Sequence, residues 1–368
     1  MATALSAPLW PSVAQAQSGS ATPMSQALAK RHLQFPRDLG SHPDTAIEWW
    51  YVTGELQAQQ RRFGFQLTFF RSRVPSTQGM RSAFVAKQLI FAHAAVTDVA
   101  GQRLLHDQRI ARSSGDTKVD LARASEADTD VTLRDWSLQR RGTSYQARAK
   151  GQDFAFDLAL LETQPLLLQG DQGLSRKGPQ PEQASYYYSL PQLAVTGELT
   201  LAGQAQPVTG RAWLDHEWSQ SIMAPVAVGW DWIGMNLDDG SALTAFRLRD
   251  KAGGTVWAGG SWRAKGAATP MVFAPEQVVF KPERFWKSPA SGSTYPVQWA
   301  VEVPVGESGT VAPQRYTVRA VVDNQELDSS RSTGAIYWEG LSELLDAQGH
   351  RVGRGYLEMT GYAQALKL

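Results

Sequence analysis

Hydrophobic and polar residues alternate along most of the chain from residue 46 onward. Residues 48–53 read Glu-Trp-Trp-Tyr-Val-Thr, and a turn and a second aromatic-rich alternating segment at 62–70 follow them, a pattern typical of a β-hairpin. Later alternating segments are separated by turn-forming sequences, at 238–240, 252–254 and 348–349. No long segment shows helical periodicity, apart from a short stretch at 24–31. The pattern therefore predicts an all-β chain of antiparallel strands.

Two pairs of similar segments divide these strands into halves. Residues 48–56 resemble residues 229–237, and residues 210–217 resemble residues 353–360. The first pair opens each half and the second pair closes it, which indicates an internal duplication. Opening and closing strands that lie next to each other are what an up-and-down barrel requires, and such a barrel can enclose one small ligand.

The duplication sets the expected domain organisation. We predict two tandem antiparallel β-barrel halves, the first at 41–222 and the second at 223–368, after an N-terminal arm at 1–40.

Composition and charge narrow the possible partners. The chain has 368 residues, with 36 lysines and arginines against 35 aspartates and glutamates, and hence a net charge of +1. This even balance provides no field for non-specific binding of nucleic acid or of an anionic membrane. The sequence has no cysteine, which excludes thiolate zinc ligands, cysteine nucleophiles and disulfides.

The N-terminal segment suggests export. Residues 1–29 carry no charged side chain, and Ala14-Gln15-Ala16 has the small-x-small form of a signal-peptidase site. We expect the remnant of a secretory signal and a periplasmic or secreted protein; a disordered N-terminal arm is the alternative. No later stretch reaches the roughly 18 apolar residues of a transmembrane helix, so no transmembrane segment is predicted.

Several groups of residues resemble motifs of the AttH family, which includes carotenoid 1,2-hydratases of the hydroxyneurosporene synthase type. These groups lie at 42–51, 92–98, 186–190, 210–218, 229–232, 299, 338–340 and 353–358. The resemblance extends over residues 40–363 and implies that each half is a lipocalin-like barrel. The family includes hydratases, fungal relatives proposed to act on polyketides, and secreted members known only as predicted hydrolases.

The first candidate catalytic residue is His216. Strand alternation puts His216 and Trp218 on one face of a strand, and Asp215 and Glu217 on the other. In the second copy Met359 stands at the position of His216. Because duplication does not explain this histidine, we expect it to belong to a functional site; a buried histidine that is hydrogen-bonded in the core is the alternative.

The second candidate is Asp231, between Trp230 and Trp232, at the position that Trp50 has in the first copy. Flanking indoles would solvate the carboxyl group poorly, raise its pKa and keep it protonated. A protonated acid could donate a proton to an alkene, aromatic rings could stabilise the carbocation, and His216 could activate the water that quenches it. We therefore predict that His216 and Asp231 face a common cavity; Asp231 pointing to solvent or capping a turn is the alternative.

Further residues are candidates for contact with the substrate, with barrel packing as the alternative reading of the aromatic ones. They are Glu48, Trp50, Tyr187, Trp218, Trp230 and Trp232. Glu48 could replace Asp231 as the acid, or could form a salt bridge with an arginine.

Other chemistries lack their motifs. The sequence has no HExxH or His-x-His motif, and Asp215 and Glu217 face away from His216, so we predict no metal site. It has no G-x-S-x-G motif for a serine nucleophile. It also has no Walker-type or G-x-G-x-x-G loop, so we predict no cofactor. The sequence favours a protein that binds an apolar isoprenoid or polyketide-type molecule, with possible cofactor-free hydration of a C=C bond. A non-catalytic periplasmic carrier of a hydrophobic ligand is the alternative, and a structural role in an export assembly is a third option.

Overall fold

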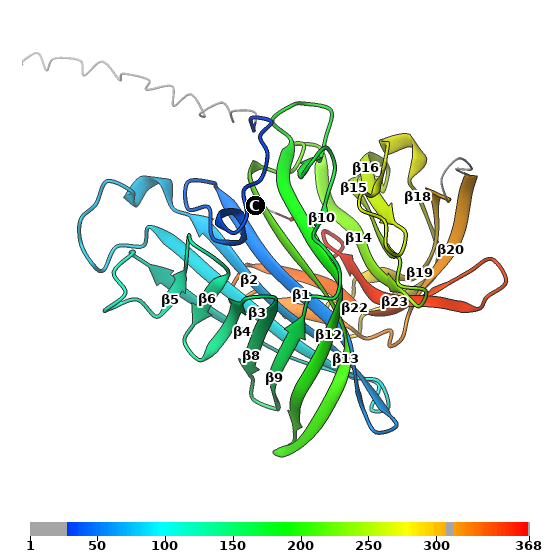
Figure 1. The fold of residues 1–368 in the computed structure, drawn as a ribbon, viewed down its shortest axis with the longest axis horizontal. Coiled ribbons are helices and arrows are strands. Elements are labelled where there is room, and N and C mark those ends of the chain that lie inside the picture. The colour runs from blue at the N-terminus through cyan, green and yellow to red at the C-terminus, as the bar shows by residue number, and fades with distance from the viewer. Residues whose placement is uncertain (1–27, 307–311, 367–368) are drawn as a thin grey trace, which may run out of the picture.

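The computed structural model describes residues 28–306 and 312–366. Strands dominate this part of the chain and form two large antiparallel sheets, one from each half (Figure 1). The predicted all-β fold of two tandem lipocalin-like halves is therefore confirmed. No helix in these two ranges has the length and apolar composition that would be needed to span a membrane.

The first half forms a sheet of thirteen strands in which β4-β3-β2-β1-β13-β12-β9-β8-β7-β6-β5 are neighbours and β10 and β11 pair with β12. The edge strands β4 and β5 touch without pairing, so the barrel is nearly closed. The strands are β1 (Ile47–Ala58), β2 (Arg61–Arg73), β3 (Gln88–Asp98), β4 (Arg103–Ser113), β5 (Ala122–Ala124), β6 (Asp130–Leu133), β7 (Trp136–Arg141), β8 (Ser144–Lys150), β9 (Phe154–Leu161), β10 (Leu167–Leu168), β11 (Leu174–Arg176), β12 (Ala184–Leu201) and β13 (Gln204–Ser221).

The second half forms a sheet of ten strands in the order β17-β16-β15-β14-β23-β22-β20-β19-β18, with β21 paired to β22. The strands are β14 (Ala227–Leu237), β15 (Ala242–Asp250), β16 (Thr255–Arg263), β17 (Met271–Phe273), β18 (Val279–Lys287), β19 (Thr294–Val305), β20 (Ala312–Ala320), β21 (Glu326–Ser329), β22 (Ala335–Leu345) and β23 (Arg351–Met359). Three short 3-10 helices complete the described elements, η1 (Arg37–Leu39), η2 (Pro75–Thr77) and η3 (Pro275–Gln277).

The central strand pairs of the two sheets have the same register. In the first half β1 pairs with β13 and Trp50 lies opposite His216. In the second half β14 pairs with β23 and Asp231 lies opposite Met359. The two sequence similarities relate these same positions, since they align Trp50 with Asp231 and His216 with Met359. The repeated register is what a duplicated barrel would retain.

The central strands are buried on both faces, and β1 is buried along nearly its whole length even where its residues are polar. Trp50 points into the core of the first half, and Ile233 points into that of the second. Tyr51 and Trp232 point the other way, into a third apolar cluster between the halves. The outer faces of the two central sheets therefore pack against each other, and it is there that the halves meet.

Polar contacts add to this packing. The amide of Asn236 accepts a hydrogen bond of 2.7 Å from the backbone N–H of Gln192 and donates one of 3.1 Å to the carbonyl of Ala212. At the other side of the junction, Nδ1 of His93 lies 2.7 Å from the hydroxyl of Tyr337. These contacts join β12, β13 and β3 of the first half to β14 and β22 of the second.

Candidate functional site

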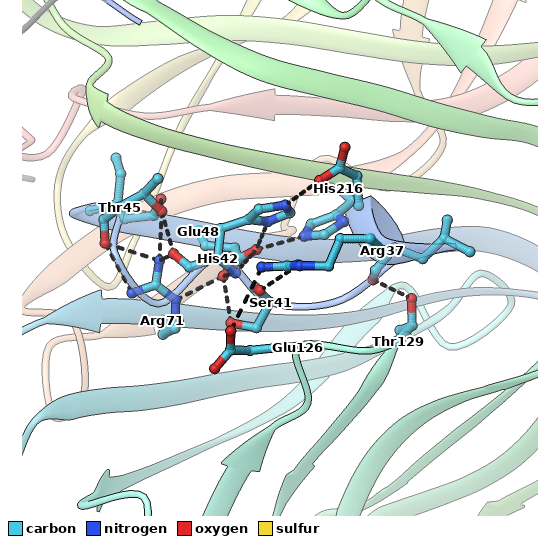
Figure 2. Close-up of polar contacts among 12 residues, drawn as sticks. Arg37, Ser41, His42, Thr45, Glu48, Arg71, Glu126, Thr129 and His216 are labelled. Carbon is cyan, nitrogen blue, oxygen red and sulfur yellow. Dashed lines mark hydrogen bonds and ion pairs between the residues drawn. The ribbon is translucent and has the colours of Figure 1, made fainter. Parts of the chain in front are cut away.

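His216 lies inside the first half and belongs to a buried polar network (Figure 2). Its Nε2 is 2.9 Å from Oε1 of Glu48, and its Nδ1 is 3.0 Å from the hydroxyl of Tyr188. The ring of Trp50 stacks on the imidazole at a centroid distance of 4.7 Å. Burial lowers the pKa of His216 to about 4, although Glu48 opposes this shift. The imidazole is therefore neutral near neutral pH.

Glu48 is the acceptor on which this network converges. Besides His216, it accepts hydrogen bonds from the hydroxyl of Ser41 at 2.8 Å, from the backbone and the ring of His42, and from Nε of Arg71 at 2.7 Å. Burial would raise the pKa of Glu48, but the hydrogen bonds from His216 and His42 and the charge of Arg71 hold it well below its ordinary value. Of the two readings left open for Glu48, the structure thus shows the salt bridge with an arginine.

His42, Glu48 and His216 also form a group of potential metal ligands, since their donor atoms lie within 4.8 Å of one another. Each histidine already shares a hydrogen bond with Glu48, and the Arg71 guanidinium supplies the positive charge that a cation would bring. A metal ion would have to displace these bonds and approach a buried guanidinium. The group is better suited to its hydrogen-bond network than to a metal.

Asp231 lies inside the other half, with its side chain fully buried on the inner face of β14. Its Oδ2 is 2.7 Å from Nε of Arg247 and 3.1 Å from Nε of Arg249, and the hydroxyl of Tyr362 donates to Oδ1 at 2.9 Å. The prediction of a carboxyl group isolated between indoles is wrong, because β15 brings two guanidinium groups to it.

The predicted common cavity for His216 and Asp231 is also wrong. His216 faces the core of the first half, and Asp231 faces that of the second, because each lies on the inner face of its own strand. Trp50 and Trp218 are likewise buried in the first core, where the Trp218 ring stacks on His42 at a centroid distance of 3.8 Å. Tyr187, Trp230 and Trp232 point in the opposite direction.

These three residues line a cavity of about 260 Å³ between the two halves. Its walls come from the outer faces of the central strands and from the segments around Ile222 and Thr360. Most of the lining is aromatic or aliphatic, with the large aromatic side chains Trp49, Tyr51, Phe70, Phe91, Tyr187, Trp230, Trp232, Phe246 and Tyr337. Five acidic residues also line it: Glu48, whose carboxylate is bound to His216 and Arg71, and Asp215, Glu217, Glu339 and Glu358. The cavity is thus an apolar space with acidic walls.

Asp215 is held in a fixed position on this wall by three donors. Its Oδ1 accepts hydrogen bonds from Ser189 at 2.6 Å and from the Trp213 indole at 2.6 Å, and its Oδ2 accepts one from Tyr187 at 2.8 Å. Burial raises the pKa of Asp215 to about 7, although the three donors oppose this shift. Asp215 is therefore a carboxyl group that can both hold and release a proton near neutral pH.

Glu217, two residues further along β13, is an ion-paired carboxylate. Nζ of Lys177 lies 3.0 Å from its Oε1, and the hydroxyl of Ser185 also donates to it. The Lys177 ammonium lies over the rings of Tyr187 and Phe246, at 4.7 and 4.2 Å from their centroids. Two carboxyl groups on the same face of one strand thus differ in their partners, since Glu217 has an ammonium partner and Asp215 has neutral donors.

Glu339 and Glu358 form the acidic part of the opposite wall. They lie directly opposite each other on β22 and β23, which brings their side chains together on one face. Burial raises the pKa of Glu358 to about 8, and the carboxylates of Asp215 and Glu217 add to this shift. Burial and the neighbouring Glu358 raise the pKa of Glu339 well above its ordinary value.

Sequence reasoning missed these four acids as a site. Asp215 and Glu217 were considered only as carboxylates that face away from His216, and 338–340 and 353–358 only as family motifs. The available signal was the alternation itself, since Asp215, Trp230 and Trp232 all occupy outward positions on the strands that open and close the halves. The alternation does not predict that the outward faces of the two halves pack against each other.

Both the sequence and the fold are similar to those of known proteins. Residues 26–362 match the AttH-like family. Among solved structures, an AttH-type protein of Nitrosomonas europaea is 44% identical with a TM-score of 0.82, over 91% of this chain and 99% of the other. No curated protein matches the sequence.

Two more distant structures share the fold. Kievitone hydratase of Nectria haematococca is 14% identical with a TM-score of 0.67, over 93% of this chain and 95% of the other. CghA in complex with Sch210972 is 12% identical with a TM-score of 0.50, over 88% of this chain and 89% of the other. The family match across nearly the whole chain, together with the 44% identity, shows that this chain belongs to the AttH-like family.

Proposed function

We propose that this protein is a hydro-lyase that adds water, without a cofactor, to a C=C bond of an apolar isoprenoid or polyketide-type molecule held in the cavity between the halves. The observation that carries the proposal is the carboxyl group of Asp215, buried on an aromatic cavity wall with a pKa raised to about 7. An acid that is partly protonated near neutral pH is what protonation of an alkene needs. The shared fold with kievitone hydratase is consistent with this reaction class.

In the first step the proton of Asp215 passes to one carbon of the double bond, and a carbocation forms at the other. Trp230 and Trp232 line the same space, and the quadrupoles of their indoles would stabilise the developing positive charge. The donors on Asp215 stabilise the carboxylate that the transfer leaves behind. Both charges that develop in the transition state therefore meet groups that are already in position.

In the second step a water molecule attacks the carbocation, and its proton passes to a carboxylate. Glu217 fits this role because it lies on the same face of β13 as Asp215 and is paired with the Lys177 ammonium. The new C–O bond takes its electrons from the water oxygen, so the net reaction consumes one alkene and one water. Return of the proton from Glu217 to Asp215 through solvent completes the cycle.

The test is hydration in water enriched in heavy oxygen, with a panel of acyclic terpenes and polyene polyketides and mass spectrometry as the readout. We expect a product with one labelled hydroxyl group from the wild type, and a rate lower by roughly 100-fold or more for Asp215→Asn. Asp157→Asn is the matched control, because Asp157 is an exposed carboxylate on β9 that pairs with Arg148. Full activity of Asp215→Asn would contradict the assignment.

A non-catalytic carrier remains the second candidate, favoured by the mostly apolar lining of the cavity. A carrier needs only such a lining, whereas a hydratase also needs Asp215 as an acid. Retention of a ligand from the panel in native mass spectrometry, without any labelled product, would identify a carrier.

Export is part of the proposal and rests on the uncharged segment 1–29 and on Ala14-Gln15-Ala16 within it, which lies outside the described residues. A periplasmic or secreted protein processed at this site would begin at Gln17. N-terminal sequencing of the protein from its native host tests this, and an intact N-terminus in the cytoplasm would contradict it.

A further inference from the structure

One wall of the cavity holds a buried carboxyl group that lacks a well-formed hydrogen bond within the described residues. Only 2% of Glu339 is exposed, and neither of its side-chain oxygens has a donor at hydrogen-bonding geometry. The hydroxyls of Tyr51 and Tyr337 lie near enough to lower its pKa, but the Tyr51 hydroxyl makes no well-formed hydrogen bond and the Tyr337 hydroxyl is bonded to His93. Buried carboxyl groups are normally hydrogen-bonded, and an unpaired one costs free energy. An arrangement of this kind on a cavity wall indicates a donor that comes with the ligand.

A second acid, Glu358, lies beside Glu339, so a ligand with a single neutral hydrogen-bond donor would satisfy only one of the two carboxyl groups. Glu358 lies directly opposite Glu339 on the neighbouring strand, and both line the cavity. The two cations on the cavity wall, Lys177 and Arg71, are already paired, with Glu217 and Glu48. A group that brings several N–H donors and a positive charge would satisfy both carboxyl groups at once.

The opposite wall shows how this cavity accommodates such a group. The Lys177 ammonium is buried there against one carboxylate and two aromatic faces, those of Tyr187 and Phe246. The pair of Glu339 and Glu358 has the same kind of surroundings, since Tyr51, Tyr337 and Trp230 line the cavity beside it. Carboxylates combined with aromatic faces are the usual receptor for an ammonium group.

From this geometry we infer that Glu339 and Glu358 bind the protonated amine of an otherwise apolar ligand, with the hydrocarbon part along Trp230, Trp232 and Phe246. The inference rests on the proposed role of the cavity as the ligand site and narrows the substrate class to amine-bearing apolar molecules. It does not depend on whether the ligand is hydrated.

Proton release would accompany binding of such a ligand. Burial raises the pKa of Glu358 to about 8 and that of Glu339 well above its ordinary value, so the pair without a ligand holds protons at neutral pH. A primary amine, with an ordinary pKa of about 10, keeps its proton and displaces one from the pair. The other titratable and charged groups that face this space are Asp215 and Glu217 on β13, Lys177 beside β12, Tyr51 on β1, Tyr187 on β12, Tyr337 on β22, Arg71 on β2, His93 on β3 and Glu48 on β1. These groups are the same whichever ligand is bound, so their effect on affinity and on the proton count cancels when two ligands are compared.

The experiment compares geranylamine with geraniol, which share one hydrocarbon chain and differ in the head group. Affinity is measured by isothermal titration calorimetry at neutral pH in two buffers of different ionisation enthalpy, so that the proton count is obtained with the affinity. We expect the amine to bind about tenfold tighter or better, with release of a proton, and geraniol to bind without release. Glu339→Gln and Glu358→Gln should each reduce the preference for the amine.

Glu302→Gln is the matched control, because Glu302 lies on β19 away from the cavity and pairs with the exposed Lys281. Melting temperatures of all three variants establish that they are folded. Equal affinities, tighter binding of geraniol, no binding of the amine, or a preference that persists in both cavity variants would overturn the inference.

The outcomes for the two proposals are separable. Preferential binding of geranylamine without hydration of any alkene would leave this inference standing and remove the hydratase. Hydration that depends on Asp215, without a preference for the amine, would support the hydratase and overturn the inference of an amine-bearing ligand.

Discussion

The hydroxyl of Tyr187 lies 2.8 Å from Oδ2 of Asp215 and donates a hydrogen bond to it. The same hydroxyl accepts a hydrogen bond of 3.2 Å from the indole of Trp232, which comes from the other half. The two halves are thus connected through the Tyr187 hydroxyl, which is bonded directly to the carboxyl group that we propose as the acid. A rearrangement of the junction would change the surroundings of Asp215 directly.

Replacement of Tyr187 by phenylalanine should raise the pKa of Asp215 further, because the hydrogen bond that it removes favours the carboxylate. Hydration needs the protonated acid, so the fall in rate at high pH should move upward by roughly one pH unit. The maximal rate should drop by about tenfold, because the carboxylate product of proton transfer loses one donor. A pH–rate profile measures both effects, and an unchanged profile would count against Asp215.

Asp215 should also make the stability of the protein depend on pH. Its pKa rises from an ordinary 3.8 to about 7 in the folded state, so the folded state holds a proton that the unfolded state has lost between these values. This contribution to the free energy of unfolding is present below about pH 4 and is lost as the pH rises through about 7. Asp215→Asn cannot titrate, so its stability relative to the wild type should improve from about pH 5 to about pH 8. Denaturant unfolding at both pH values is the measurement, and parallel changes in the two proteins would refute the assignment.

His216→Ala should behave as a change in the core of the first half. It removes a fully buried ring that stacks on Trp50 and hydrogen-bonds Glu48, so we expect a loss of about 2–4 kcal/mol in the free energy of unfolding. The pKa of His216, about 4 against an ordinary 6.5, gives a contribution that is present above pH 6.5 and is lost as the pH falls toward 4. Ligand affinity in the cavity should stay within a factor of about three, because His216 does not line it. Weaker ligand binding with intact stability would instead identify His216 as part of a site.

Asp231→Asn should destabilise the second half by about 3 kcal/mol, because it leaves the buried guanidinium groups of Arg247 and Arg249 without a carboxylate. Thermal unfolding measures this loss, and calorimetry with geranylamine should show unchanged affinity. Loss of hydration in a variant that keeps its stability would restore Asp231 as a candidate acid.

The fold was predictable from the sequence because its evidence is local and repeated. Alternation over 48–53 and 62–70 specified a hairpin, and the structure has it as β1 and β2. The two internal similarities specified which strands open and close each half, and the pairings of β1 with β13 and of β14 with β23 agree with them.

The site was less predictable because it lies between the halves rather than within one. His216 and Asp231 stood out as polar residues at otherwise apolar positions, but each is bonded to partners that only the fold brings near, Glu48 for His216 and two arginines for Asp231. Asp215 looked less unusual, although burial raises its pKa to about 7 against the three donors that favour its carboxylate. Alternation gives the face on which a side chain lies, but it does not tell which outer faces pack together.

The central claim is that the cavity holds a carboxylic acid at Asp215 that is still partly protonated near neutral pH. Difference infrared spectroscopy of the wild type against Asp215→Asn measures this directly, through the C=O stretch of the protonated acid. The account predicts a band that Asp215→Asn lacks and that disappears as the pH rises through about 7. A band that disappears near the ordinary value of 3.8, or no difference between the two proteins above that pH, would contradict it.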